Sequence, residues 1–63
     1  ELFIETATPN NSISIYSLQG ILVRKVFANS NVTKINVNDL SSGVYFVEVF
    51  NDKGKKYQKI IVR

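Results

Sequence analysis

Side chains that could carry out catalysis are scarce in this sequence of 63 residues. It contains neither histidine nor cysteine, so it lacks the usual near-neutral acid–base group, the thiolate nucleophile and the commonest metal ligands. Its carboxylates are Glu1, Glu5, Asp39, Glu48 and Asp52. No two of them have a spacing that places both at one site. Ser41 and Ser42 have neither a histidine base nor a Gly-x-Ser-x-Gly context. We therefore expect no enzyme, no catalytic residue, no metal ligand and no cofactor.

Positive charge is concentrated near the end of the sequence. Eight Lys/Arg against five Asp/Glu give a net charge of +3, and five of these cations lie within the last eleven residues. They are Lys53, Lys55, Lys56, Lys59 and Arg63. Such a patch favours acidic surfaces, but lysines also keep an exposed strand edge from aggregating. Only Tyr57 is interleaved with these lysines, which is a weak signal for base stacking, so we expect no nucleic-acid partner.

The elements that must position these side chains are predicted to be strands. Apolar residues alternate with polar ones at a period of two, and no useful window shows a helical period. The expected strands are residues 2–4, 12–16, 21–27, 33–37, 44–51 and 56–63. Turn residues separate them at roughly 8–12-residue spacing, which is typical of small β-domains. We predict a single all-β domain, a small antiparallel Ig-like β-sandwich of about six to seven short strands.

The alternation also predicts which side chains face the core. The expected inward set is Leu2, Ile4, Ile13, Ile15, Val23, Ile35, Val37, Leu40, Tyr45, Val47, Val49, Ile60 and Val62. Phe46 and Phe50 fall on the opposite face of the same strand, where we expect them to pack against a second sheet. If they were exposed, they would form a hydrophobic patch of the kind that often marks an interaction surface in a monomer. A chain of this length buries only about 60% of its unfolded surface, so a thin core is expected.

A tight turn leads into the longest strand. Asp39 precedes Leu40-Ser41-Ser42-Gly43, and an Asp at such a position can accept backbone N–H groups. Leu40 is expected to pack beneath the turn. We assign Gly20, Asp39, Leu40, Gly43 and Tyr45 to holding the fold.

Three segments, taken in order, resemble the C-terminal sorting domain of type IX secretion cargo from Bacteroidota. The first, Ile13 to Gly20 with Val23, resembles the block I-x-I-Y-D-x-x-G-K-x-V, with Ser17 where Asp is usual and Ile21 in place of Lys. The second, Ile35 to Val47, resembles I-D-V-S-x-L-x-x-G-x-Y-x-V. The third, Lys59 to Arg63, resembles the finish K-x-x-V-x.

The resemblance implies a secretion address with no reaction of its own. Cargo carrying such a domain passes through the periplasm and crosses the outer membrane to be secreted or displayed at the cell surface. The implied partners are the outer-membrane shuttle or translocon of the type IX system and a sortase-type protease that removes the domain. We assign recognition to Lys59, Ile60, Ile61, Val62 and Arg63, because an extended strand suits β-augmentation. An ordinary core strand is the other interpretation of these residues, and the two are compatible.

One departure from the family pattern concerns the start of the chain. Family members usually open with a strand carrying Pro-Asn-Pro, shortly before the segment matched by Leu2 to Glu5, whereas Pro9-Asn10 comes too late and in a loop. We expect residues 1–63 to lack that first strand and to form a homodimer or exchange strands at the exposed edge. The alternative function is a generic Ig-like adhesion or carbohydrate-binding module, which predicts exposed aromatic side chains on one face.

Overall fold

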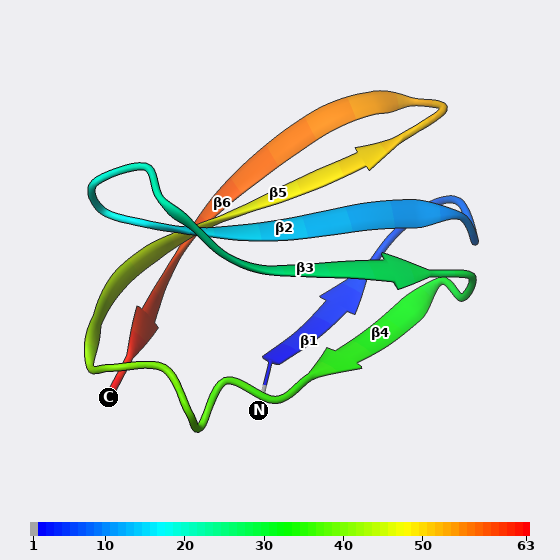
Figure 1. The fold of residues 1–63 in the computed structure, drawn as a ribbon. Helices are drawn as coiled ribbons and strands as arrows, with labels where there is room; N and C mark the ends of the chain where they lie inside the picture. Colours follow the sequence, from blue (N-terminus) through cyan, green and yellow to red (C-terminus); the bar gives the residue numbers. More distant parts are fainter. Residues whose placement is uncertain (1) are drawn as a thin grey trace.

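The computed structural model describes residues 2–63, which form six β-strands and no helix (Figure 1). The strands are β1 (Leu2–Glu5), β2 (Asn11–Ser17), β3 (Leu22–Ala28), β4 (Val32–Ile35), β5 (Gly43–Asn51) and β6 (Gly54–Val62). Each lies within two residues of the bounds expected from the alternation. Residues 2–63 contain no helix long and apolar enough to cross a membrane.

The strands form two antiparallel sheets. One sheet has four strands in the order β3-β2-β5-β6, and the other has two, β1 and β4. Two hairpins, β2–β3 and β5–β6, build the larger sheet, and β2 and β5 join them at its centre. The smaller sheet lies against one face of the larger one (Figure 1). The prediction of a small all-β sandwich, consistent with an Ig-like architecture, is confirmed.

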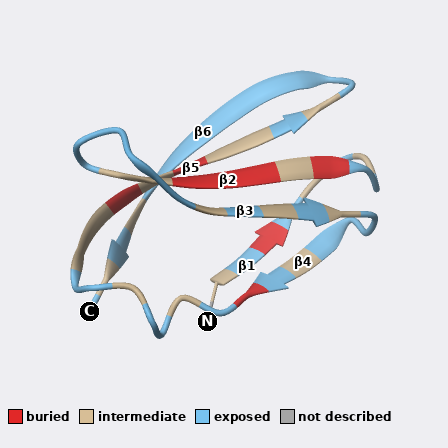
Figure 2. Ribbon diagram, in the orientation of Figure 1, coloured by how far each residue is buried: buried red, intermediate tan, exposed pale blue. Residues whose placement is uncertain are grey.

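The core lies between the sheets and is supplied mainly by the two central strands. Ile13, Ile15 and Val47 have at most 1% of their surface exposed, because β2 and β5 have neighbours on both sides and a sheet below (Figure 2). Ile4, Ile35 and Tyr45 complete the buried cluster. Every other predicted inward residue except Val23 packs against this cluster.

The inward assignment of Val23 is wrong, because a β-bulge interrupts the alternation. Ile15 pairs with Arg24 while Tyr16 pairs with Leu22, so Val23 is an extra residue in β3. It is 38% exposed and lies outside the core. After the bulge, the even-numbered positions of β3 face inward, and Val26 packs against the core in place of Val23.

The expectation that Phe46 and Phe50 pack against a second sheet is also wrong. The two-stranded sheet covers only the face of β5 that carries Tyr45 and Val47. Phe50 is 50% exposed, and Phe46 is only partly buried by its neighbours within the sheet. A two-stranded sheet cannot cover both faces of a four-stranded one, so one face remains open.

The turn between β2 and β3 explains the departure at Ser17. Gly20 has φ +86°, a left-handed conformation that glycine adopts at little cost. Its N–H donates to the Ser17 carbonyl at 2.9 Å. The Ser17 hydroxyl oxygen in turn accepts the N–H of Ile21 at 3.2 Å. Serine thus supplies a side-chain acceptor where the motif described above usually has Asp.

Candidate recognition site

The strand that carries most of the predicted recognition residues lies at the edge of the larger sheet. Among residues 2–63, β6 pairs with β5 alone, from Asn51↔Gly54 to Gly43↔Val62. Its other edge is open. Lys59 to Val62 lie in the last part of this strand, and Arg63 follows directly after it. The site is therefore a stretch of unpaired backbone with side chains alternating on either face.

The register identifies the backbone groups at the open edge. Asn51 and Gly54 close a hairpin with a two-residue loop, and such a closing pair directs its N–H and C=O groups toward each other. Gly54 has φ +115°, a conformation that glycine adopts at little cost. Every second residue from Gly54 therefore faces β5. The N–H groups of Lys59 and Ile61, between these positions, point toward the open edge.

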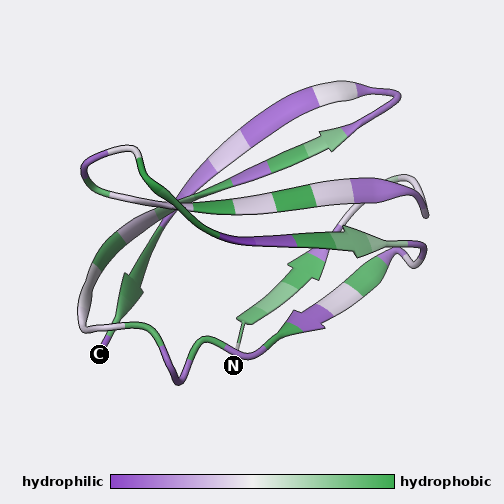
Figure 3. Ribbon diagram, viewed as in Figure 1, coloured by the Kyte–Doolittle hydropathy of each residue, from purple (hydrophilic) through white to green (hydrophobic). Residues whose placement is uncertain are grey.

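The predicted recognition residues divide between the two faces of β6. Ile60 and Val62 are half-buried and pack against the core. Ile61 is 62% exposed, and Lys59 is exposed beside it on the other face. Figure 3 shows that β6 is largely hydrophilic along its first part and hydrophobic near its end. The same strand thus packs against the core through Ile60 and Val62 and has an open edge, while the recognition role of the segment stays a prediction.

A groove of about 340 Å³ opens between the sheets where β1 faces β5 and β6. Val47 and Val49 belong to its lining, together with Phe3 of β1 and Gln58 of β6. Among the described residues β1 pairs only with β4, so its other edge is unpaired. The groove therefore lies beside an unpaired strand edge.

The turn before β5 is fastened from within. The Tyr45 hydroxyl donates to the Ser41 carbonyl at 2.7 Å. Tyr45 is buried, with 8% of its surface exposed. Buried tyrosines that bond back to a nearby loop recur in β-sandwiches. Leu40 packs against the core as expected, and its N–H donates to the Val37 carbonyl at 3.1 Å.

Comparison with known proteins gives one match. The model of the secretion system C-terminal sorting domain, which marks cargo of the type IX system, matches residues 1–63. The chain belongs to this family. No curated protein and no solved structure matches the chain.

Membership establishes the function in outline. The chain is a C-terminal sorting signal for the type IX secretion system, and the protein that carries it is a secreted or cell-surface protein. A sorting signal must interact with the secretion machinery. Among residues 2–63 no group of three or more carboxylates lies close enough to hold a metal ion.

Asp39 of the sorting domain forms an ion pair that the sequence did not reveal. Its carboxylate lies 2.5 Å from the Arg24 guanidinium, which also donates to the Asn36 carbonyl. The hydrogen bond from Arg24 is the main cause that lowers the pKa of the Asp39 carboxyl from its usual value. Arg24 is inward at this point because the bulge at Val23 shifts the alternation. The pair joins β3 to the turn before β5.

We expect Asp39→Asn to destabilise the sorting domain slightly at pH 7, and not at pH 2. Because folding lowers the Asp39 pKa, the stabilisation is present above the unfolded pKa and is lost as pH falls through the folded one. Denaturant titrations of both proteins at the two pH values measure this. Asp52→Asn, in the exposed hairpin turn, is the control. A difference that persists unchanged at pH 2 would contradict the assignment.

A buried amide, which sequence reasoning also missed, ties together one end of the sandwich. Asn11 is only 5% exposed. Its side-chain nitrogen donates to the Thr6 hydroxyl at 2.9 Å and to the Thr8 carbonyl at 2.8 Å. Its side-chain oxygen accepts the Asn51 amide at 2.8 Å. The loop after β1, the start of β2 and the end of β5 are thus held by one side chain. In the sequence, Asn11 lies just before the strand predicted at residues 12–16, and an asparagine there indicates a loop.

We expect Asn11→Ala to destabilise the sorting domain by about 1–3 kcal/mol, because it leaves buried partners of the amide unsatisfied. Thermal and denaturant unfolding followed by circular dichroism measure the loss. Asn29→Ala is the matched control, since Asn29 is exposed and its replacement should be nearly neutral. Equal effects of the two substitutions would show that the amide network contributes nothing.

Proposed function

We propose that this sorting domain acts without catalysing a reaction, as a folded address recognised in the periplasm. The outer-membrane shuttle or translocon of the type IX system would bind the open edge of β6 and carry the cargo across the outer membrane. A sortase-type protease would then remove the domain. The observation that carries the proposal is the position of Lys59 to Val62 on an edge strand whose outer side is unpaired.

β-Augmentation supplies the mechanism. A strand of the receptor that pairs with β6 would gain main-chain hydrogen bonds from the outward N–H and C=O groups, as in other complexes that extend a sheet. Side chains of the added strand would meet those of β6 on both faces of the sheet. On the face of the larger sheet turned away from β1 and β4, these side chains are Lys59 and Ile61. The signal therefore combines a positive charge with an exposed apolar side chain. Arg63 would add a second positive charge beyond the strand.

The first test is a reporter fused to residues 1–63 in a type IX-competent cell. We expect the complete fusion to reach the surface and the fusion lacking Lys59 to Arg63 to remain in the periplasm. Because this deletion also removes Ile60 and Val62 from the core, its effect on folding must be separated from its effect on recognition. Surface export of the truncated fusion would show that these residues are not the signal.

We also propose that the open edge of β1 takes a further strand, in keeping with the expected absence of a first strand. In the isolated chain a second copy can supply it. Two β1 strands that pair antiparallel would join the two smaller sheets into one around a twofold axis. The groove beside β1, whose lining includes the apolar side chains of Phe3 and Val49, supports this proposal.

The homodimer predicts a concentration-dependent change in mass. We expect sedimentation equilibrium to show a monomer–dimer equilibrium for residues 1–63. Phe3→Lys should shift it toward the monomer, because the side chain is 63% exposed and the twofold axis would bring like charges together. Ile61→Lys, on the edge of the other sheet, should leave it unchanged. A monomer at every concentration would refute the dimer.

A further inference from the structure

The face of the larger sheet turned away from β1 and β4 is unusual for a surface exposed to water. An antiparallel sheet with one covered face normally carries polar side chains on the other. Here Phe27, Phe50 and Tyr57 are 77%, 50% and 64% exposed. We call this the outer face, and it comprises Ser12, Ser14, Tyr16, Leu22, Lys25, Phe27, Val44, Phe46, Glu48, Phe50, Lys55, Tyr57, Lys59 and Ile61.

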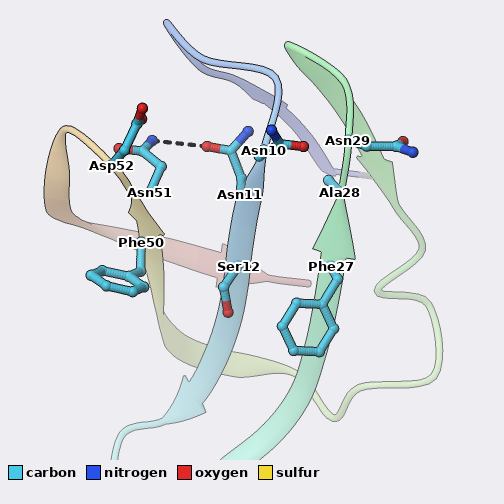
Figure 4. Close-up of a pocket in the computed structure, with 9 residues that line it drawn as sticks. All are labelled: Asn10, Asn11, Ser12, Phe27, Ala28, Asn29, Phe50, Asn51 and Asp52. Atoms are coloured by element: carbon cyan, nitrogen blue, oxygen red, sulfur yellow. Dashed lines mark hydrogen bonds between the residues drawn. The ribbon is translucent and has the colours of Figure 1, made fainter.

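A shallow depression crosses the outer face at one end. Ser12 pairs with Phe27 on one side and with Phe50 on the other. Neighbouring strands lie about 4.8 Å apart, so the two phenylalanines start roughly 10 Å from each other. Figure 4 shows their rings on either side of the short Ser12 side chain. The space between them fits one flat or branched apolar side chain.

Positive charge flanks this depression. The Lys25 amino group lies 5.4 Å from the centroid of the Phe27 ring, and that of Lys55 lies 5.7 Å from the Phe50 ring. Each phenylalanine ring therefore forms a cation–π interaction with a lysine amino group. Lys59 extends the positive charge along β6. Asp52 lines the far end of the depression, next to the hairpin turn.

The outer face has one carboxylate. Glu48 pairs with Tyr57 across the strands, and interaction with the Glu48 carboxylate raises the Tyr57 pKa. Lys25, Lys55 and Lys59 outnumber this single carboxylate, so the outer face presents a positive field around an apolar depression.

We infer that the outer face binds an acidic segment of a partner protein. An apolar side chain of that segment enters between Phe27 and Phe50, and carboxylates before and after it pair with Lys25 and Lys55. Charge complementarity favours this occupant over a second copy, since a twofold contact through the same face would bring these lysines together in a chain of net charge +3. The depression between Phe27 and Phe50 is distinct from the open backbone edge of β6, although Lys59 and Ile61 of that strand also belong to the outer face.

The test uses the ¹⁵N-labelled chain and the peptide acetyl-Gly-Asp-Asp-Phe-Asp-Asp-Gly-amide as the probe. We expect amide shift changes during the titration to centre on Ser12, Phe27 and Phe50. Phe27→Ala with Phe50→Ala should weaken binding at least about tenfold, equivalent to about 1.4 kcal/mol. Lys25→Gln with Lys55→Gln should weaken it about fivefold and lower its dependence on salt. Val23→Ala, which removes an exposed apolar side chain outside the depression, should leave binding unchanged.

Several outcomes would overturn the inference. Equal binding of a peptide with lysines in place of the aspartates would remove the charge argument, and failure of the acidic peptide to bind would remove the site. Pelleting with phosphatidylglycerol vesicles that depends on Phe27 and Phe50, without peptide binding, would assign the face to a membrane. Chemical shift changes that depend on protein concentration, and not on the peptide, would assign the outer face to a contact with a second copy.

Discussion

Ile61→Pro leaves the sorting domain folded and stops export of a fused reporter; this is the largest functional effect that we expect from a single substitution. Proline removes the N–H of residue 61, which the hairpin register directs to the open edge of β6. The hydrogen bonds to β5 come from the alternate residues and remain. Proline is tolerated on strand edges whose N–H faces outward, and the preceding Ile60 already needs an extended backbone. An added receptor strand would lose a hydrogen bond and meet the proline ring.

The matched control is Ile61→Thr, which keeps the N–H and the β-branched shape. Circular dichroism and thermal unfolding of both variants establish that each is folded, and immunoblots of periplasm and cell surface locate the reporter. We expect the threonine variant to be exported and the proline variant to accumulate in the periplasm. Export of a folded proline variant would rule out recognition through this edge. Loss of export in both would assign recognition to the Ile61 side chain instead of the backbone.

Ile15→Ala is expected to remove a large part of the folding stability of the chain, which is the largest stability effect. Ile15 is completely buried, between Arg24 of β3 and Val47 of β5 in the sheet. Truncating a buried isoleucine to alanine costs about 2–5 kcal/mol. A domain of this size is stable by only roughly 3–9 kcal/mol. No disulfide supports the core, since the chain has no cysteine.

The same change at Ile61 provides the control for Ile15→Ala. Ile61 is 62% exposed, so Ile61→Ala should cost less than about 1 kcal/mol, as surface substitutions usually do. Urea titrations followed by circular dichroism compare the two variants with the parent chain. Similar midpoints for Ile15→Ala and Ile61→Ala would show that the core is not where the buried surface indicates.

The sequence predicted the strands and almost all of the core because period-two alternation depends only on neighbouring residues. Turns with a local cause were predicted for the same reason, such as the one that requires Gly20. The bulge at Val23 was missed, since it depends on how β3 pairs with β2 and no local pattern marks it. The open face with Phe46 and Phe50 was missed because the size of the opposing sheet is a property of the whole fold.

The candidate recognition site divides in the same way. The residue types of Lys59 to Val62 predict a strand. The strand order of the sheet, by contrast, determines that the outer edge of this strand is unpaired. The ion pair of Arg24 with Asp39 and the amide contacts of Asn11 with Asn51 join residues far apart in the chain. Polar side chains of this kind have many partners available, and only the fold selects one.

The pairing of β2 with β5 has a consequence for the timing of export. The two hairpins can form locally, but Ser12 must meet Phe50 from the other half of the chain before β6 has a sheet to extend. Non-local strand pairing slows folding, into the millisecond-to-second range for β-rich domains. A receptor that reads the β6 edge within the complete sheet would therefore bind each newly arrived polypeptide only after this pairing, so folding of the sorting domain would set the earliest moment of export.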